Sequence, residues 1–177
     1  VDGRAQERDF TVRIDPRLVD QVSIGDLQER FELAMDVRDR VSEANEAVLR
    51  VRDIKSSIDD RVEGSENLEL KSLGATVKDR LAAVEGEIYQ VRNESNQDPL
   101  NFPIKLNNKL ASLLGIIESA EARPTAQVYE VFEMLSGQLD TELQQLTLII
   151  QQDLARLNEL LRSLGMDPIE SQQIITE

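Results

Sequence analysis

The sequence contains no cysteine, no histidine and no tryptophan. Without cysteine it can form neither disulfides nor thiolate metal sites. The lack of histidine also excludes the Glu-x-x-His pairs that hold two metal ions inside a helical bundle. We therefore expect no metal and no other cofactor. Because cysteine usage is the sequence signal for redox compartment, the chain could fold in an oxidising or a reducing environment.

Aromatic residues are also scarce, with four Phe and two Tyr among 177 residues. A core made of Leu, Ile, Val and Ala suits helices packed on helices better than a β-sandwich or an aromatic-lined pocket. The length is typical of a single domain with a sizeable core. These two properties together favour a helical domain.

Basic residues are fewer than acidic ones, with 20 Lys and Arg compared with 34 Asp and Glu, which gives a net charge of -14. Such a chain repels nucleic acid and anionic membrane surfaces, so we expect no nucleic-acid partner. No run of eighteen apolar residues exists, and we expect no membrane insertion. The opening VDGRAQERDF has neither the basic and apolar parts of a signal peptide nor a Met, and we interpret it as a cut through a longer protein.

What the sequence does contain is a strong helical period from Asp26 to Val62, with no Pro or Gly inside it. Apolar residues recur every seven positions in two seams, which predicts a helix that lays one stripe against other helices. Ser23 and Asp26 fit a capping box and Gly64 fits a left-handed C-cap, so the predicted helix covers residues 24–62. The seams are Leu27, Ala34, Val41 and Val48, and Val37, Ala44, Val51 and Ile58.

Three further segments show steps of three and four between apolar residues. They predict helices over 66–92, 104–122 and 124–164, separated by turn and breaker residues. Gly74 and Gly86 are expected to allow close helix approach. The predicted fold is therefore all-α, an antiparallel four-helix bundle with two long helices, over residues 19–169. Residues 170–177 are expected to form a C-terminal tail.

Residues 1–18 differ from the rest. Asp2-Gly3 is a hairpin-turn dipeptide, and Phe10, Val12 and Ile14 then alternate with polar residues, which is typical of a half-buried strand. We interpret this short strand or hairpin as the end of a truncated β domain that precedes the bundle. An ordered extended arm lying on the bundle is the alternative.

One set of polar residues recurs every seven positions beside the seam of the first helix: Arg38, Asn45, Arg52 and Asp59. We call these four residues the polar row. Their spacing places them next to a neighbouring helix. We favour a role in fixing helix register, with Glu142 or Asp153 of the last helix as partners. The alternative is a docking surface for another domain.

No catalytic residues can be assigned. Carboxylates such as Asp36 and Glu46 lie outside the apolar seam and stand four residues before an Arg, which favours a solvated, salt-bridged helix face over an acid/base pair. The sequence has no glycine-rich phosphate loop and no nucleophile motif. We expect this chain by itself not to be an enzyme.

Three phrases carry a family resemblance: FTVRIDPRL, RFELAMDVRDRVSEANEAVLRVRDIK and VYEVFEMLSGQLDTELQQL. They resemble the C-terminal region of large bacterial proteins with BNR-type, sortilin-like β-propeller repeats, commonly labelled glycosyl hydrolases. In that family a small Ig-like domain follows the propeller, its last strand ends in a phrase like the one from Val12 to Arg17, and a helical region comes next. The resemblance implies export, hence an extracellular or periplasmic location.

Two functions follow as expectations. The first is a non-catalytic helical scaffold or interaction module at the C-terminus of a secreted propeller protein. The second is an accessory domain that shapes the substrate cleft of a glycoside hydrolase. In either case the expected partners are the propeller and Ig-like domains of its own chain, and a homodimer is compatible with both.

Overall fold

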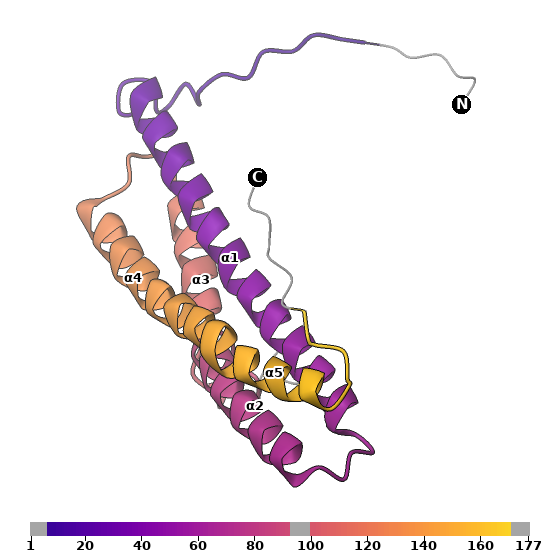
Figure 1. The fold of residues 1–177 in the computed structure, drawn as a ribbon. Coiled ribbons are helices and arrows are strands. Elements are labelled where there is room, and N and C mark those ends of the chain that lie inside the picture. The colour runs from indigo at the N-terminus through magenta and orange to yellow at the C-terminus, as the bar shows by residue number, and fades with distance from the viewer. Residues whose placement is uncertain (1–6, 93–99, 171–177) are drawn as a thin grey trace.

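The computed structural model describes residues 7–92 and 100–170, and its helices pack against one another in a single elongated bundle (Figure 1). The described part contains no β-strand. The predicted all-α bundle of four helical segments is therefore confirmed. The elements are α1 (Ile24–Val62), α2 (Leu68–Ile88), α3 (Leu106–Glu118), α4 (Ala126–Leu148), the π-helical segment η2 (Ile149–Leu154) and α5 (Ala155–Ser163).

Helix α1 begins and ends where the sequence predicts. The Ser23 hydroxyl accepts a hydrogen bond of 3.1 Å from the Asp26 N–H, and the Asp26 carboxylate accepts one of 2.9 Å from the Ser23 N–H, which completes the capping box. Gly64 has a φ of 75°, a conformation that glycine adopts at little cost. The chain then reverses into α2, whose Leu70 N–H donates to the Asn67 side chain at 2.9 Å.

Gly74 lets α2 approach α1 closely. A Cβ at this position would lie 3.1 Å from methyl groups of both Ile58 and Val62, so the expected close approach is confirmed. At Gly86 no atom lies within 4 Å of the corresponding position, and the same expectation is wrong there.

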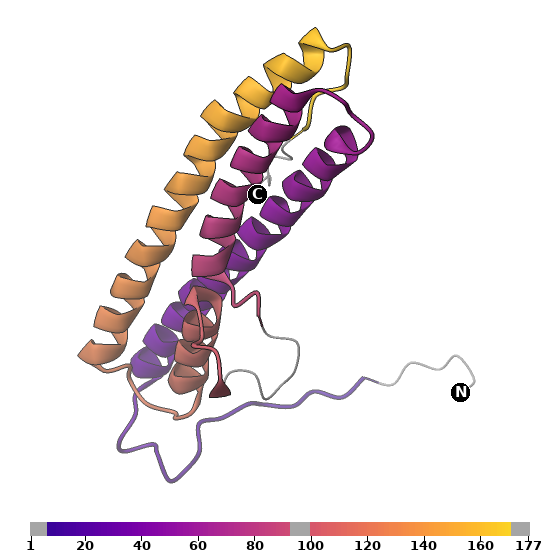
Figure 2. The same cartoon turned by 90° about the horizontal axis from the view of Figure 1, so that it is seen from below.

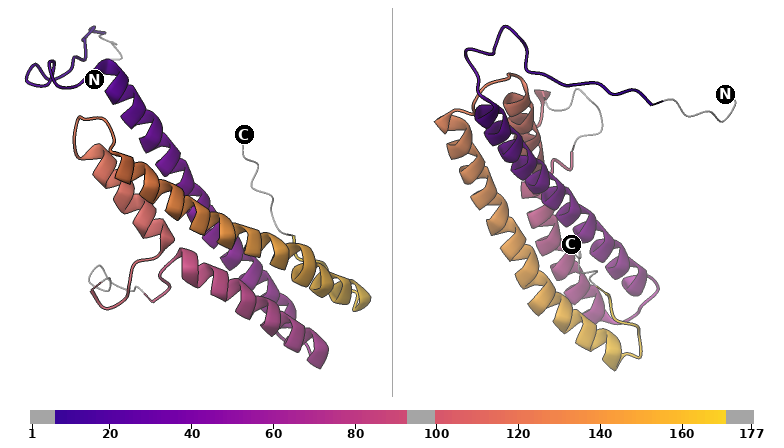
Figure 3. Two further views of the ribbon diagram at one scale, coloured as in Figure 1. Left: turned by 90° about the vertical axis from the view of Figure 1, so that its left-hand side faces the viewer. Right: turned by 90° about the horizontal axis from the view of Figure 1, so that it is seen from above.

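Helices α2 and α3 follow one another along α1 in the same direction (Figure 3). Helix α1 has 39 residues and spans roughly 58 Å, whereas the 21 residues of α2 span only about 31 Å. One short helix therefore covers only part of the α1 seam, and α3 covers the rest. The contacts along α1 pair Asp59 with Lys78, Arg52 with Glu85, Asn45 with Asn107 and Arg30 with the Ala120 carbonyl.

This order changes the direction of the last helix. In a bundle with strictly alternating directions, the first and fourth helices would be antiparallel. Here α4 runs parallel to α1, with Glu29 next to Tyr129 and Arg40 next to Asp140 (Figure 2). The difference arises because α2 and α3 together make a single return path along α1.

The core is aliphatic and continuous along the bundle, as the composition predicts. It draws on every helix, and all four residues of the second α1 seam lie in it. Among the largest fully buried side chains are Ile54, Ile58, Leu81, Leu110, Leu139 and Leu157.

The fourth predicted helix, 124–164, contains an irregularity that its sequence does not reveal. Residues Ile149–Leu154 form a π-helical turn between α4 and α5. The two ends of this turn, Ile149 and Leu154, are both buried although they lie five positions apart. A π turn holds more residues than an α turn, so it keeps both side chains on the core side of the helix.

Helices α2 and α3 each begin two residues later and end four residues earlier than predicted. Near these ends, side chains form hydrogen bonds with backbone groups in place of the bonds that a longer helix would make. Gln90, for example, donates to the Pro103 carbonyl at 2.8 Å and accepts from the Arg92 N–H at 3.3 Å.

The strand predicted over residues 10–14 does not form. Residues 7–15 have no regular structure and lead away from the helices (Figures 1 and 2). A strand needs a partner for its backbone N–H and C=O groups, and the described residues offer none. The expected hairpin turn at Asp2-Gly3 lies outside the described residues.

Beyond α5 the chain packs back onto the bundle. The Asn158 side chain donates to the Ile169 carbonyl at 3.0 Å and accepts from the Ile169 N–H at 2.7 Å, and Ile169 is buried. Of the expected tail, only Glu170 belongs to the described residues.

Candidate functional site

The polar row lies on the side of α1 that faces α2 and α3. Asn45, Arg52 and Asp59 each contact one of these two helices. Arg38 instead pairs with its neighbour Asp39 at 2.5 Å and is exposed. The structure thus brings three of the four predicted residues to a helix interface, and leaves Arg38 outside it.

A buried carboxylate, that of Glu85 on α2, is the centre of this interface. Its side chain is only 5% exposed, and it accepts hydrogen bonds from Arg52 Nε at 2.6 Å and Lys55 Nζ at 3.0 Å. Burial by itself would raise the pKa of Glu85, but the bonds from Arg52 and Lys55 outweigh it and hold this pKa below its ordinary value. The carboxylate therefore stays ionised, and the same hydrogen bond raises the pKa of Arg52.

Tyr89 completes the cluster. Its ring centroid lies 4.9 Å from the Arg52 guanidinium carbon, within the range of a cation–π contact. Arg52 is thereby held by an ion pair and an aromatic face that both come from the C-terminal end of α2. Arg52 on α1 therefore contacts two residues, Glu85 and Tyr89, that lie four positions apart at the end of α2.

Asn45 makes the corresponding interhelical contact with α3. Its side-chain oxygen accepts a hydrogen bond of 3.2 Å from the Asn107 amide, and Asn107 is only 8% exposed. The Asn107 oxygen in turn accepts from the Asn108 N–H at 2.8 Å, in the first turn of α3. The pair connects the start of α3 to the middle of α1.

The partners predicted on the last helix are wrong. Asp153 pairs with Arg80 of α2, and Glu142 lies near Glu87 and Lys105. Burial and the charge of Glu87 raise the pKa of Glu142. The polar row meets α2 and α3 instead, because α4 packs against the opposite side of the α1 seam, where Glu29 and Arg40 make the contacts.

The Glu85 carboxylate is fully engaged within its cluster. Both oxygens of the carboxylate already accept charge-assisted bonds, so Glu85 is a poor base, and the Lys55 amine is held as an ion-pair partner of the same carboxylate. Within residues 7–92 and 100–170, no group of three or more His, Cys, Asp or Glu side chains is placed to hold a metal ion. The chemistry of this site is that of an interhelical clamp.

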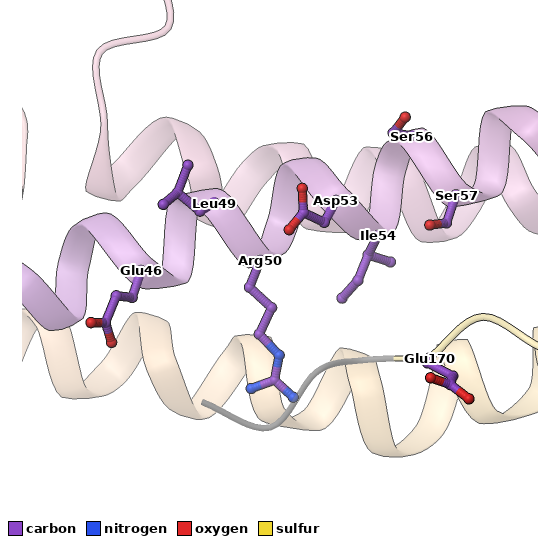
Figure 4. Close-up of a pocket in the computed structure, with 8 residues that line it drawn as sticks. All are labelled: Glu46, Leu49, Arg50, Asp53, Ile54, Ser56, Ser57 and Glu170. Atoms are coloured by element: carbon purple, nitrogen blue, oxygen red, sulfur yellow. The ribbon is translucent and has the colours of Figure 1, made fainter. Parts of the chain in front are cut away.

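A groove that the sequence patterns did not predict runs along α1, with residues of α4 opposite it in its two smaller hollows. Three adjoining hollows form it. The middle hollow shares Glu46 and Arg50 with one neighbour and Glu43 with the other. The largest has a volume of about 590 Å³ and lies beside α1 between Glu46 and Ser57, with Glu170 on its other side (Figure 4). We call these hollows together the α1–α4 groove. Leu49, an apolar residue outside both seams, is the signal that could have indicated it.

The segment before α1 is a second exposed feature. Phe10 is 86% and Val12 83% exposed, while Ile14 is partly buried. The first backbone hydrogen bond of this region in the described residues joins the Leu18 N–H to the Asp15 carbonyl at 2.9 Å. Within the part of the chain that the structure describes, residues 10–14 therefore present both apolar side chains and backbone groups without a partner.

Fold and site together define an all-α bundle with a polar clamp between its helices and two open surfaces, the N-terminal segment and the groove. No helix of the described part is long and apolar enough to cross a membrane. No family model matches this sequence, and comparison with curated proteins and with solved structures finds no match either.

Proposed function

We propose that this chain is a non-catalytic helical scaffold that docks a β domain through residues 10–14. The observation that carries the proposal is the exposure of Phe10 and Val12 on an extended segment that stands off the bundle. Addition of a strand to an open sheet edge pairs the backbone and places alternate side chains on one face. Phe10, Val12 and Ile14 are the alternate residues.

Hydrogen-bonded turns connect the extended segment to the start of α1. Asp15 ends the extended part and accepts from the Arg17 N–H at 2.9 Å, and Ser23 and Asp26 then cap α1. The segment is thus attached directly to the longest helix. A β domain paired with it would sit at the N-terminal end of the bundle, beyond Ile24.

The family resemblance suggests the partner. A chain like those propeller proteins would carry an Ig-like domain next to this segment, and residues 10–14 would form its last strand. The bundle would then hold the propeller and Ig-like domains in place outside the cell or in the periplasm. The accessory role in a glycoside hydrolase needs the same docking and would differ in having a substrate cleft beside the bundle.

Hydrogen exchange tests the docking. Amide exchange at residues 10–14 is compared between the 177-residue chain and the full-length gene product that contains it. We expect at least a hundredfold slower exchange in the full-length protein, since strand pairing protects these amides. Val12→Pro removes one donor N–H and should abolish the protection, while the helical circular dichroism of the bundle stays unchanged. Equal exchange in both proteins would overturn the proposal.

A further inference from the structure

The α1–α4 groove is continuous over several helical turns. On α1 it extends from Glu43 to Ser57, which is roughly 21 Å at about 1.5 Å per residue. Its middle hollow shares Glu46 and Arg50 with one neighbour, and Glu43 and Leu143 with the other. Its length therefore matches about four turns of another helix.

Apolar side chains line the floor and both edges of the groove. Ala47, Ile54 and Leu146 form the buried floor. Leu49 on the α1 edge is 59% exposed and Leu148 on the α4 edge is 40% exposed. Leu49 lines the largest hollow and Leu148 the hollow at the other end, so covering them would remove apolar surface from water toward both ends of an occupant.

The rim carries negative charge. Arg40 pairs with both Glu43 and Asp140 at one end of the groove, so a single cation is shared between these two acids. Among the ion pairs of the described residues, none involves Glu46, Asp53 or Glu170, which surround the largest hollow (Figure 4). The net charge of the chain has the same sign, at -14. The groove therefore attracts cationic groups.

Arg50 adds one directional feature. It projects from α1 across the groove toward the last helix (Figure 4), and its Nε is buried without a hydrogen-bond partner in the described part of the chain. Such a donor needs an acceptor. Because Nε is already enclosed by the chain itself, an oxygen of the occupant can bond to it only if the Arg50 side chain moves.

We propose that the α1–α4 groove binds an amphipathic helix of a partner protein, with an apolar stripe that faces Leu49 and Leu148 and with Lys or Arg residues that flank the stripe. This surface is separate from residues 10–14 and does not depend on their role. A second copy of this chain fits poorly, because two molecules of net charge -14 would bring acidic faces together. Anionic lipid is disfavoured for the same reason.

A model peptide tests the proposal. The probe is a fluorescein-labelled, 18-residue leucine–lysine peptide with leucines at helical spacing, titrated with the full chain at about 0.15 M salt and followed by fluorescence anisotropy. One control peptide has the same composition in scrambled order. A second keeps the apolar stripe and replaces every lysine by glutamate. We expect at least tenfold tighter binding of the amphipathic leucine–lysine peptide than of either control.

Variants locate the binding. Leu49→Glu and Asp53→Lys change exposed groove residues, and each should weaken binding at least tenfold. Ile116→Glu on α3 and Asp79→Lys on α2 make the same chemical changes at exposed positions elsewhere, and each should change affinity less than twofold. Circular dichroism of each variant confirms folding, and the two groove variants serve as independent tests.

Three results would overturn the proposal. The first is equal affinity for the scrambled peptide, which would indicate attraction by net charge alone. The second is equal weakening by the groove and control variants. The third is a set of backbone amide shift changes, on addition of the peptide, that avoids residues 43–57 and 140–150. The Val12→Pro chain should bind the peptide like the wild type, so failure of the strand-docking proposal would leave this result intact.

Discussion

The Glu85 carboxylate on α2 accepts a hydrogen bond of 2.6 Å from Arg52 Nε on α1, and this pair connects the two helices at the buried edge of their interface. Glu85 is buried and Arg52 is half-exposed. Removing Arg52 therefore leaves the buried partner with Lys55 alone. Removing Glu85 leaves two cations without their shared acceptor.

Arg52→Ala should lower the free energy of unfolding by about 1–3 kcal/mol, because it takes a charged donor away from a buried carboxylate. Arg38→Ala is the matched control, since Arg38 belongs to the same polar row but contacts only Asp39. It should change stability by less than about 0.5 kcal/mol. Urea denaturation of both variants gives the comparison. Equal midpoints for Arg52→Ala and wild type would favour a docking role for the row over a register role.

Asn45→Ala should destabilise the bundle by about 0.5–1.5 kcal/mol, because the mostly buried Asn107 amide loses an acceptor. A double-mutant cycle with Asn107→Ala measures the coupling directly. We expect a coupling of about 0.5–1 kcal/mol. Additive effects of the two substitutions would show that this contact does not help to hold α3 on α1.

Stability should fall in acid partly through Glu85. Its pKa is lower in the folded protein than the unfolded value near 4.3, because the bonds from Arg52 and Lys55 outweigh burial. A carboxyl with a depressed folded-state pKa contributes stability above its unfolded pKa, and this contribution is lost as pH falls through the folded-state pKa. Denaturation midpoints of wild type and Glu85→Gln, measured between about pH 2 and 7, should converge as pH falls. Parallel curves would contradict this assignment.

The two helical glycines of α2 should respond oppositely to alanine. At Gly74 a Cβ would lie 3.1 Å from Ile58 and Val62, so Gly74→Ala should cost about 1–2 kcal/mol despite its gain in helix propensity. Gly86→Ala meets no atom within 4 Å and should stabilise by up to about 1 kcal/mol. Thermal unfolding of both variants checks the pair, and a shift of the same sign in both would argue against the close approach of α1 and α2.

Any dimer of the 177-residue chain should depend on residues 10–14, because this segment has exposed apolar side chains and, among the described residues, no backbone partner, and can add as a strand to another molecule. Light scattering of the chain with and without residues 1–18 measures this. The dimer fraction should drop at least tenfold on deletion. A dimer that survives the deletion would place self-association elsewhere on the bundle.

The elements set by local chemistry could be predicted from the sequence. The capping box at Ser23 and Asp26, the left-handed Gly64 and the Asn67 cap involve neighbours within a few residues, so their sequence pattern contains the whole interaction. The apolar period gave the helices for the same reason. Composition was enough to predict an aliphatic, all-helical core.

Long-range packing decided the rest. Helix α3 continues along α1 because α2 leaves part of the α1 seam uncovered. As a result α4 runs parallel to α1, opposite to the direction expected for strictly alternating helices. The partners of Arg52 and Asn45 therefore lie on α2 and α3 and not on the last helix. The π turn at Ile149–Leu154 exists because both ends must face the core, a condition that spacing along the chain does not express. Phe10 to Ile14 carry the alternation of a strand, but a strand is completed only by the hydrogen bonds of a neighbour. Sequence determined which side chains face inward on each helix; the tertiary structure determined which of them meet.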